Sequence, residues 1–251
     1  MANKLSLIYQ DSNVVAVNKP AGLASIPGRG ETTSVLEELA RQLSLPCRGD
    51  TDPRLRVVHR LDKDTSGVLA FALNIEAQRY LSHQFQNNTV QKQYLALVVG
   101  RPPEEEGEID APIMPDRHKP GRMMIHKRGK PARTMWKIER TYKAMTLLRM
   151  MPRTGKTHQI RVHLQHIGHP LVVDDVYGIP AGEKGSGLYL SQYKRDYRLG
   201  KFKEEKPLIS RLTLHAHKLE LELPDGRHAE FEAPLPKDFQ TTLNMLDKYA
   251  R

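Results

Sequence analysis

Residues 57–73 read Val-Val-His-Arg-Leu-Asp-Lys-Asp-Thr-Ser-Gly-Val-Leu-Ala-Phe-Ala-Leu and place a polar segment between two apolar runs. The apolar runs, Val57–Val58 and Val68–Leu73, predict two strands. Between them, His59–Gly67 carries carboxylates, basic groups and hydroxyls. A polar loop on a rigid scaffold is a common place for catalytic groups, but an Asp-rich loop is also typical of a solvated turn. On this segment alone, both interpretations stay open.

The residues around this segment predict further short elements. Residues 5–18 alternate as a hairpin with its turn at 11–13. Apolar residues at helical spacing predict a helix over 33–43, and Asn74 is placed to cap a second helix of about 12 residues. Residues 94–99 form a near-continuous apolar run, which predicts a strand covered on both faces.

The second half of the chain again alternates strands with few helices. Two strand pairs are predicted, over 134–142 with 144–151 and over 208–222 with 228–232. A helix is predicted from a Thr157 cap to about Ile167, with Gly168 at the left-handed position after it. Residues 101–133 are rich in proline and glycine and predict loops.

These patterns favour an α+β fold with a long, mainly antiparallel sheet, because strands dominate and hairpin connections are common. We find no repeat, low-complexity linker or strong boundary. The expectation is therefore a single domain, 1–251, with basic loop insertions near 101–133 and 180–207.

The charge balance indicates a polyanionic partner. Lys and Arg number 39 against 29 Asp and Glu, a formal net charge of +10. Such a field concentrates nucleic acid near the protein, although basic proteins also occur for solubility alone. The chain has no long apolar run and its N-terminus lacks the apolar stretch of a signal peptide, so neither a membrane span nor secretion is expected. A single cysteine, Cys47, excludes an internal disulfide, and a cytoplasmic location is expected.

The segment Thr154–His163 contains a Gly-Lys-Thr triplet that resembles part of a phosphate-binding loop. The nucleotide motif needs a further glycine five residues before Gly155, and that position is Met150. No nucleotide cofactor is therefore expected. Four histidines, His158, His163, His166 and His169, invite a metal interpretation. Their spacing does not place three of them clearly on one helical face, so no metal site is predicted.

Two basic segments are candidates for gripping phosphates. The first is Arg117, Lys119, Arg122, Lys127, Arg128, Lys130 and Arg133. The second is Lys184, Lys194, Arg195, Arg198, Lys201, Lys203 and Lys206. The second also carries Tyr189, Tyr193 and Tyr197, which would share one face if the segment were helical; packing on the core is the preferred interpretation for these rings.

Five motifs in order along the chain resemble the RluA family of pseudouridine synthases. His59–Gly67 is similar to the signature His-Arg-Leu-Asp, two variable residues, Thr-Ser-Gly. The other four are Asn18–Gly22, Lys92–Ala96, Gly155–Gly178 (with Gly-x-x-His-Gln-Ile-Arg and Asp-x-x-Tyr-Gly) and Leu212–Ala216. The set spans most of the chain, and its order makes it far more specific than any one motif.

The resemblance implies an RNA-modifying enzyme that isomerises uridine in structured ribosomal or transfer RNA, without cofactor or metal. It implies that Asp62 is the catalytic residue, that Tyr94 packs on the target base and that Arg161 pairs with the catalytic carboxylate. Arg60 is expected to enter the RNA stack as the base flips out, with Lys19 and His59 also on the RNA side. Asp64 occupies a variable position and should be dispensable.

Two mechanisms and two other classes of function stay open. Asp62 is expected either to attack C1′ or to remove the C2′ proton. The alternative function is a non-catalytic RNA-binding or ribosome-assembly module on the same fold, with a metal-dependent nuclease a distant third. The default oligomeric state is a monomer.

Overall fold

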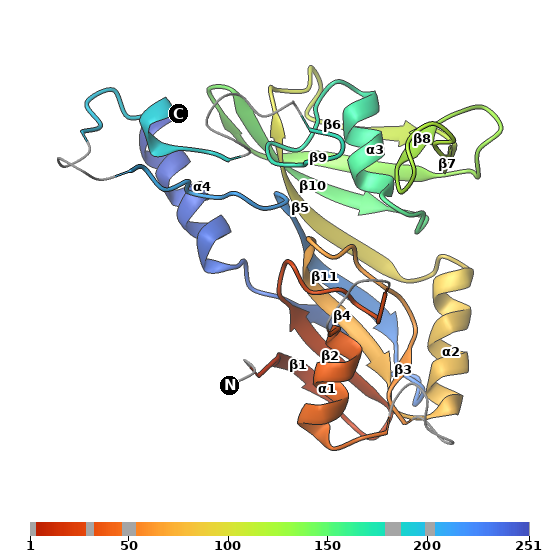
Figure 1. Cartoon of the computed structure of the whole chain (residues 1–251). Helices are drawn as coiled ribbons and strands as arrows, with labels where there is room; N and C mark the ends of the chain where they lie inside the picture. Colours follow the sequence, from red (N-terminus) through yellow and green to blue (C-terminus); the bar gives the residue numbers. More distant parts are fainter. Residues whose placement is uncertain (1–3, 29–32, 47–53, 179–186, 199–203, 251) are drawn as a thin grey trace. The chain divides into compact units, whose positions relative to one another are not determined.

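The computed structural model describes residues 4–28, 33–46, 54–178, 187–198 and 204–250 (Figure 1). The chain divides into two compact units. Unit 1 comprises residues 1–94 and 215–234, and unit 2 comprises residues 95–214 and 235–251. Strands β5 (Gln91–Val99) and β11 (Leu214–Glu222) contribute residues to both units.

Unit 1 is built on strands that are mostly antiparallel. They are β1 (Ser6–Gln10), β2 (Val14–Lys19), β3 (Arg56–Val57), β4 (Ser66–Ala72), β12 (His228–Glu232) and the unit 1 parts of β5 and β11. Strand β2 pairs antiparallel with β1 and β4, and β12 pairs antiparallel with β11. Strand β11 runs parallel to β4 over a short register that pairs His215 with Ser66. The predicted 5–18 hairpin and the α+β class are thereby confirmed.

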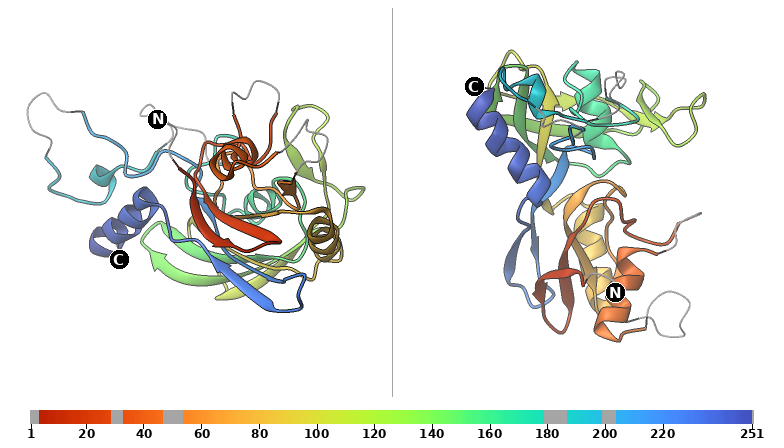
Figure 2. Two further views of the ribbon diagram at one scale, coloured as in Figure 1. Left: turned by 90° about the horizontal axis from the view of Figure 1, so that it is seen from below. Right: turned by 60° about the vertical axis from the view of Figure 1, so that its left-hand side comes forward.

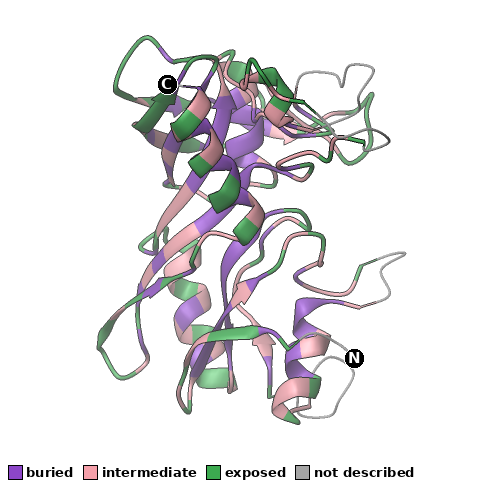
Figure 3. Cartoon of the chain, turned by 90° about the vertical axis from the view of Figure 1, so that its left-hand side faces the viewer, coloured by how far each residue is buried: buried purple, intermediate pink, exposed green. Residues whose placement is uncertain are grey.

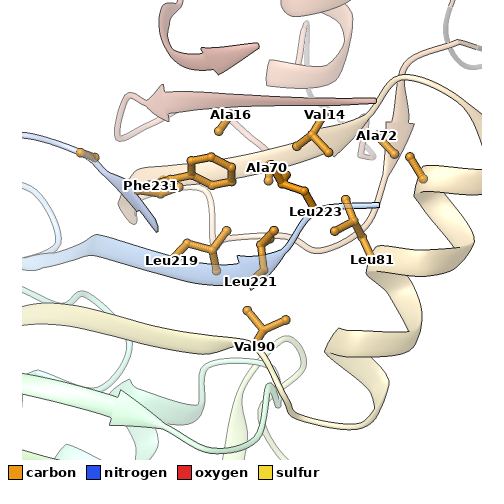
Figure 4. Close-up of a cluster of buried hydrophobic side chains, with 13 residues drawn as sticks. Val14, Ala16, Ala70, Ala72, Leu81, Val90, Leu219, Leu221, Leu223 and Phe231 are labelled. Atoms are coloured by element: carbon orange, nitrogen blue, oxygen red, sulfur yellow. The ribbon is translucent and has the colours of Figure 1, made fainter. Parts of the chain in front are cut away.

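Strands β2 and β4 are buried on both faces, because their alternating side chains pack against different helices. Val15, Val17, Leu69 and Phe71 cluster with Val35, Leu36 and Leu39 of α1 (Val35–Leu43). Val14, Ala16, Val68, Ala70 and Ala72 cluster with Ala77 and Leu81 of α2 (Ile75–Gln86) and with β11 and β12 (Figure 4). This explains why both strands read as continuous apolar runs.

Side chains cap both α1 and α2, and the cap predicted at Asn74 is confirmed. The side chain of Asn74 accepts a hydrogen bond from the backbone N–H of Ala77, and α2 has the expected 12 residues. Ser34 caps α1 in the same way, through the backbone N–H of Glu37. Both caps satisfy a donor that the first helical turn leaves unpaired.

Unit 2 contains the remaining strands and, among its described residues, two α-helices. Its strands are β6 (Glu106–Asp110), β7 (Ile113–Pro115), β8 (Met123–Ile125), β9 (Arg133–Tyr142), β10 (Met145–Pro152) and the unit 2 part of β5. Strand β9 pairs antiparallel with β10 and β6, and β7 pairs with β8 in a separate hairpin that projects beside α3 (Gln159–His166) (Figures 1 and 2). Phe239, Leu243 and Leu246 of α4 (Lys237–Tyr249) pack on apolar residues of β5 and β10. In both units the buried residues concentrate along the strands, whereas the exposed ones gather in turns and on outer helix faces (Figure 3).

Several predicted boundaries in unit 2 were wrong. Thr157 does not cap α3: the helix begins at Gln159, after His158 in a left-handed conformation with φ 54°. The Gln159 carboxamide oxygen instead accepts the Thr154 hydroxyl and the Lys156 N–H, which closes the preceding turn. The predicted loop region 101–133 contains β6, β7 and β8. Strand β11 starts at Leu214 rather than 208, and α4 was not predicted.

The tyrosine-bearing basic segment contains only one short 3-10 turn, Leu190–Gln192, among its described residues. The condition for a helical tyrosine stripe is therefore not met there. Lys184, Lys201 and Lys203 of that segment, and Cys47, lie outside the described residues.

His59 joins the core of unit 1 to the polar loop. Its Nε2 accepts a hydrogen bond from the backbone N–H of Ala70 at 3.0 Å, and its ring stacks on Phe85 with 4.5 Å between centroids. Burial, followed by the positive charge of Lys92, lowers the pKa of His59 to about 3. The neutral ring is thus required for the bond to Ala70.

Replacing Asn74 with alanine should lower the free energy of unfolding by about 1 kcal/mol, the usual contribution of a side-chain N-cap. Urea unfolding measures this difference. Gln86→Ala, at the other end of the same helix, is the matched control and should change stability little. Equal effects of the two substitutions would contradict the capping role.

His59 should make the protein less stable as the pH falls below about 6.5, the pKa of an unperturbed histidine. Between that value and about 3 the unfolded chain binds a proton at His59 and the native chain does not. The free energy of unfolding then falls by up to about 1.4 kcal/mol for each pH unit. His59→Gln, which keeps an acceptor for Ala70, should flatten the slope measured by urea unfolding between pH 7 and 5. An unchanged slope would argue against a neutral His59 in the native protein.

Candidate active site

The polar loop of unit 1 exposes some of its side chains and buries others. Leu61 is buried in the α1 side of the core, at 7% exposure. Asp62, directly after it, is half-buried, whereas Arg60, Lys63 and Asp64 are exposed. The backbone between Leu61 and Thr65 forms a turn in which the N–H of Thr65 donates to the carbonyl of Asp62 at 3.2 Å.

The residues on each side of Asp62 are held by the segment 19–25. The Ser25 hydroxyl donates to the Leu61 carbonyl at 2.7 Å and accepts from the Leu61 N–H at 3.0 Å. The Lys63 carbonyl accepts the Nζ of Lys19 at 2.7 Å and the N–H of Gly22 at 3.0 Å. Asp62 therefore lies between two backbone positions that are each fixed by two hydrogen bonds.

Lys19 is fully buried, and its ammonium also donates to the carbonyls of Pro20 and Leu23. Its three N–H groups thus have three acceptors. This position favours a role in holding the loop over the direct RNA contact predicted from the sequence. The same holds for His59, whose ring is engaged by Ala70 and Phe85. Arg60 is exposed, as an approach to RNA would require.

Tyr94 is the last residue of the first stretch of unit 1 and lies partly buried against the α1 side of the core. Burial raises the pKa of the Tyr94 hydroxyl, and the negative charge of Asp62 raises it further. The two predicted residues are therefore close enough to interact electrostatically within the same unit. The hydroxyl stays protonated at physiological pH, so Tyr94 offers a neutral aromatic face beside a carboxylate.

Arg161 lies on α3 in unit 2, where it forms a two-point ion pair with Asp174. Its Nε and Nη2 donate to the two carboxylate oxygens at 2.7 and 2.8 Å, and the pair is almost wholly buried. Burial would raise the pKa of Asp174, but the Arg161 guanidinium and two backbone N–H groups outweigh it and lower that pKa. Asp62 belongs to the other unit, so its pairing with Arg161 stays a prediction.

Sequence reasoning missed Ser25 and the role of Asp174. Ser25 lies outside the Asn-Lys-Pro-Ala-Gly motif, and no pattern in the sequence links it to Leu61. Asp174 belongs to the Asp-x-x-Tyr-Gly motif, but no local pattern in the sequence links it to Arg161, 13 residues earlier. The burial of both charges, which only the structure shows, is what makes a pair expected, since buried charges are rarely found without one.

The histidines of the α3 region have structural partners. Both ring nitrogens of His163 are hydrogen-bonded, one to the Thr134 hydroxyl and one to the Ala111 carbonyl. His169 bonds the Val99 carbonyl. Across the described ranges, three or more His, Cys, Asp or Glu side chains do not gather as a metal site would require. No helix in the described part of the chain is long and apolar enough to cross a bilayer.

Comparison with known proteins places these features in a family. Residues 13–166 match the family described as RNA pseudouridylate synthase. The ribosomal large subunit pseudouridine synthase D of Nitrosomonas europaea is 38% identical over 243 residues, covering 96% of this chain and 65% of that protein. An uncharacterized RNA pseudouridine synthase of Chloroflexus aurantiacus is 42% identical, covering 93% and 66%. This chain thus spans just under two thirds of both relatives.

Solved structures agree with the sequence comparison. The human RNA pseudouridylate synthase domain containing 1 aligns with a TM-score of 0.69 at 26% identity, covering 92% of this chain and 84% of the human one. Human RNA pseudouridylate synthase domain containing 4 aligns with a TM-score of 0.68 at 27% identity, covering 96% and 93%. The resemblance inferred from the five motifs is confirmed, and the chain belongs to the RNA pseudouridylate synthases, in the RluA family that its motifs indicate.

Proposed function

We propose that this chain isomerises uridine to pseudouridine in structured RNA, with Asp62 as the catalytic residue and ribosomal RNA as the first substrate to test. The observation that carries the proposal is the rigid backbone on both sides of Asp62, which presents a half-buried carboxylate beside Tyr94. Relatives named ribosomal large subunit pseudouridine synthase D support ribosomal RNA over transfer RNA as the substrate. We propose that residues 1–251 together form the single catalytic domain predicted from the sequence.

The reaction requires little from the protein beyond a correctly positioned carboxylate. The C1′–N1 bond breaks, the uracil turns, and C5 bonds to C1′ while its proton leaves and N1 gains one. Nothing is oxidised and no external group is consumed, so the reaction itself requires no cofactor. Asp62 either attacks C1′ or takes the C2′ proton. For both routes it must be ionised, and a nearby guanidinium such as that of Arg161 favours the ionised form.

The target base has to leave the RNA stack before Asp62 can act, at a cost of a few kcal/mol. Tyr94 offers the flipped uracil a face, worth about 1–3 kcal/mol by analogy with other base–aromatic contacts. Arg60 is exposed on the same loop as Asp62, and its planar cation suits the space that the base vacates. Lys19 and His59 contribute by holding the loop.

RNA capture is assigned to the basic hairpin, which we define as residues 113–130. It bears five exposed cations, Arg117, Lys119, Lys127, Arg128 and Lys130. Exposed cations on a projecting hairpin reach phosphates at low cost, and each phosphate neutralised steepens the salt dependence of binding. We propose that the protein works in the cytoplasm, as expected from its composition, and as a monomer, which is the default oligomeric state.

Asp62→Asn should abolish pseudouridine formation and leave RNA binding within about twofold of wild type, because the amide keeps the shape and removes the reactive charge. Tritium release from RNA labelled at uracil C5 measures the reaction, on ribosomal and transfer RNA separately. Asp64→Asn is the matched control and should stay active. Release by Asp62→Asn would remove that residue from catalysis. Tight binding without release by wild type would favour a non-catalytic binding module.

Removing two hairpin cations by Lys127→Gln with Arg128→Gln should weaken RNA binding and flatten its salt dependence. The slope of log Kd against log salt should fall by about 1.4–1.8, depending on whether the contacted RNA is single- or double-stranded. Filter binding from 50 to 200 mM salt measures it. Lys137→Gln with Arg140→Gln, two cations already paired with Glu106 and Asp247, is the control pair. An equal loss in both double variants would show a general charge effect.

A further inference from the structure

Tyr177 occupies the centre of a polar cluster in unit 2 and is almost wholly buried, at 1% exposure. Two guanidinium groups lie over its ring, with the Cζ of Arg161 5.1 Å and that of Arg122 5.0 Å from the ring centroid. Arg161 is thus contacted by Asp174 through its nitrogen atoms and by Tyr177 through the ring face. An arginine held in both ways has few orientations available to it.

The hydroxyl of Tyr177 joins two elements that are distant in sequence. It accepts the backbone N–H of Met123, the first residue of β8, at 2.7 Å. It is also hydrogen-bonded to Nδ1 of His158 at 2.9 Å. His158 is the left-handed residue before α3, a conformation that costs a residue with a side chain about 1 kcal/mol or more. The surrounding contacts therefore have to hold it there.

A second connection runs beside the first. The Gln165 side chain, one turn along α3 from Arg161, donates to the Tyr177 carbonyl at 3.0 Å. The same side chain accepts from Nη2 of Arg122 at 3.0 Å. Arg122 directly precedes β8 and belongs to the basic hairpin. The hairpin is therefore tied to Tyr177 through both the Met123 backbone and the Arg122 side chain.

We propose that Tyr177 is a positioning residue that couples the basic hairpin to Arg161, so that RNA held by the hairpin sets the orientation of that guanidinium. This rests on the proposed function, which gives the hairpin phosphate contacts and gives Arg161 the support of the catalytic carboxylate. Phosphates bound to the hairpin restrain Met123 and Arg122. Met123 restrains the hydroxyl of Tyr177 and Arg122 restrains its ring, and the ring in turn limits the orientations open to the Arg161 guanidinium. Binding energy gained far from the reacting atoms is thereby used to orient a group near them.

Tyr177→Phe isolates the hydroxyl, since it keeps the ring against both arginines. In single-turnover experiments at saturating enzyme, we expect the rate of pseudouridine formation to fall about tenfold, the size that one lost buried hydrogen bond represents. The Kd for RNA should stay within about twofold of wild type. Tyr193→Phe is the matched control: the Tyr193 hydroxyl contacts a methionine sulfur at 4.0 Å, and both constants should be unchanged. An unchanged rate in Tyr177→Phe would overturn the proposal.

A purely structural role predicts a different pattern. If Tyr177 only stabilised unit 2, the activity of Tyr177→Phe would fall in proportion to the fraction of unfolded protein. At a temperature well below Tm, where the variant is folded, its single-turnover rate at saturating enzyme would then equal that of wild type. A tenfold rate loss that persists there, with Kd retained, is expected from mispositioning. Recovery of the rate would overturn the coupling.

A measurement without RNA or turnover keeps this inference separate from the proposed function. The Nε proton of Arg161 is bonded to Asp174 and should give a slowly exchanging NMR signal in the free wild-type protein. In Tyr177→Phe we expect that proton to exchange several-fold faster, and in Tyr193→Phe at the wild-type rate. Equal protection in all three proteins would overturn the positioning role even if the enzyme were active. Faster exchange in Tyr177→Phe than in wild type, in a protein whose wild type makes no pseudouridine, would instead reject the proposed function and keep the positioning of Arg161.

Discussion

The arrangement around Asp62 depends on one buried ammonium. Lys19 carries its charge into the interior of unit 1, and such a charge is tolerated only when hydrogen bonds replace the water it has lost. Three backbone carbonyls do so, and one of them belongs to Lys63 of the polar loop. Since the ammonium cannot give up an acceptor without a large penalty, the segment 19–25 and the loop behave as one rigid piece. The Ser25 hydroxyl secures the other side of Asp62 through the Leu61 backbone. The position of the Asp62 carboxylate is thus set by Lys19 and Ser25, which bond the backbone of its two neighbours.

The strand that follows the loop is fixed as firmly. The backbone of Gly67 has φ 119°, and a Cβ there would lie 2.1 Å from the Ala216 carbonyl oxygen, so only glycine permits β4 and β11 to approach. Beside it, the Ser66 hydroxyl is hydrogen-bonded to Nδ1 of His215, whose Nε2 bonds the Ala233 carbonyl. These contacts explain physically why Ser-Gly ends the loop motif and why a histidine belongs to the late strand: together they set the parallel register of β4 with β11.

Unit 2 fixes the position of a second charged group, the guanidinium of Arg161. Arg161 is held by a buried carboxylate on its edge and an aromatic ring on its face, and the ring in turn is held by the basic hairpin and the turn before α3. A buried ion pair contributes little net stability, because desolvation offsets its attraction. Its value here is geometric: the two-point contact fixes the plane of the guanidinium. The two units therefore follow one principle: buried polar contacts orient the residue proposed to react in one unit and the residue proposed to support it in the other.

The sequence by itself determined the family, the class of fold and most elements of unit 1. Period-two and continuous apolar patterns are local, so the hairpin, β4 and the Asn74-capped helix could be predicted from neighbouring residues, and the ordered motifs led to Asp62. The tertiary structure alone decided what holds those residues. Lys19 bonding Lys63, Ser25 bonding Leu61 and Arg161 held against Tyr177 each join residues that share no local pattern. The same reason explains the errors near α3 and in 101–133: the turn at Gln159 is closed by a side-chain carboxamide, and β6 exists because β9 supplies its hydrogen-bonding partner. Local pattern selects an element, whereas partners distant in the chain select its ends and the roles of its polar side chains.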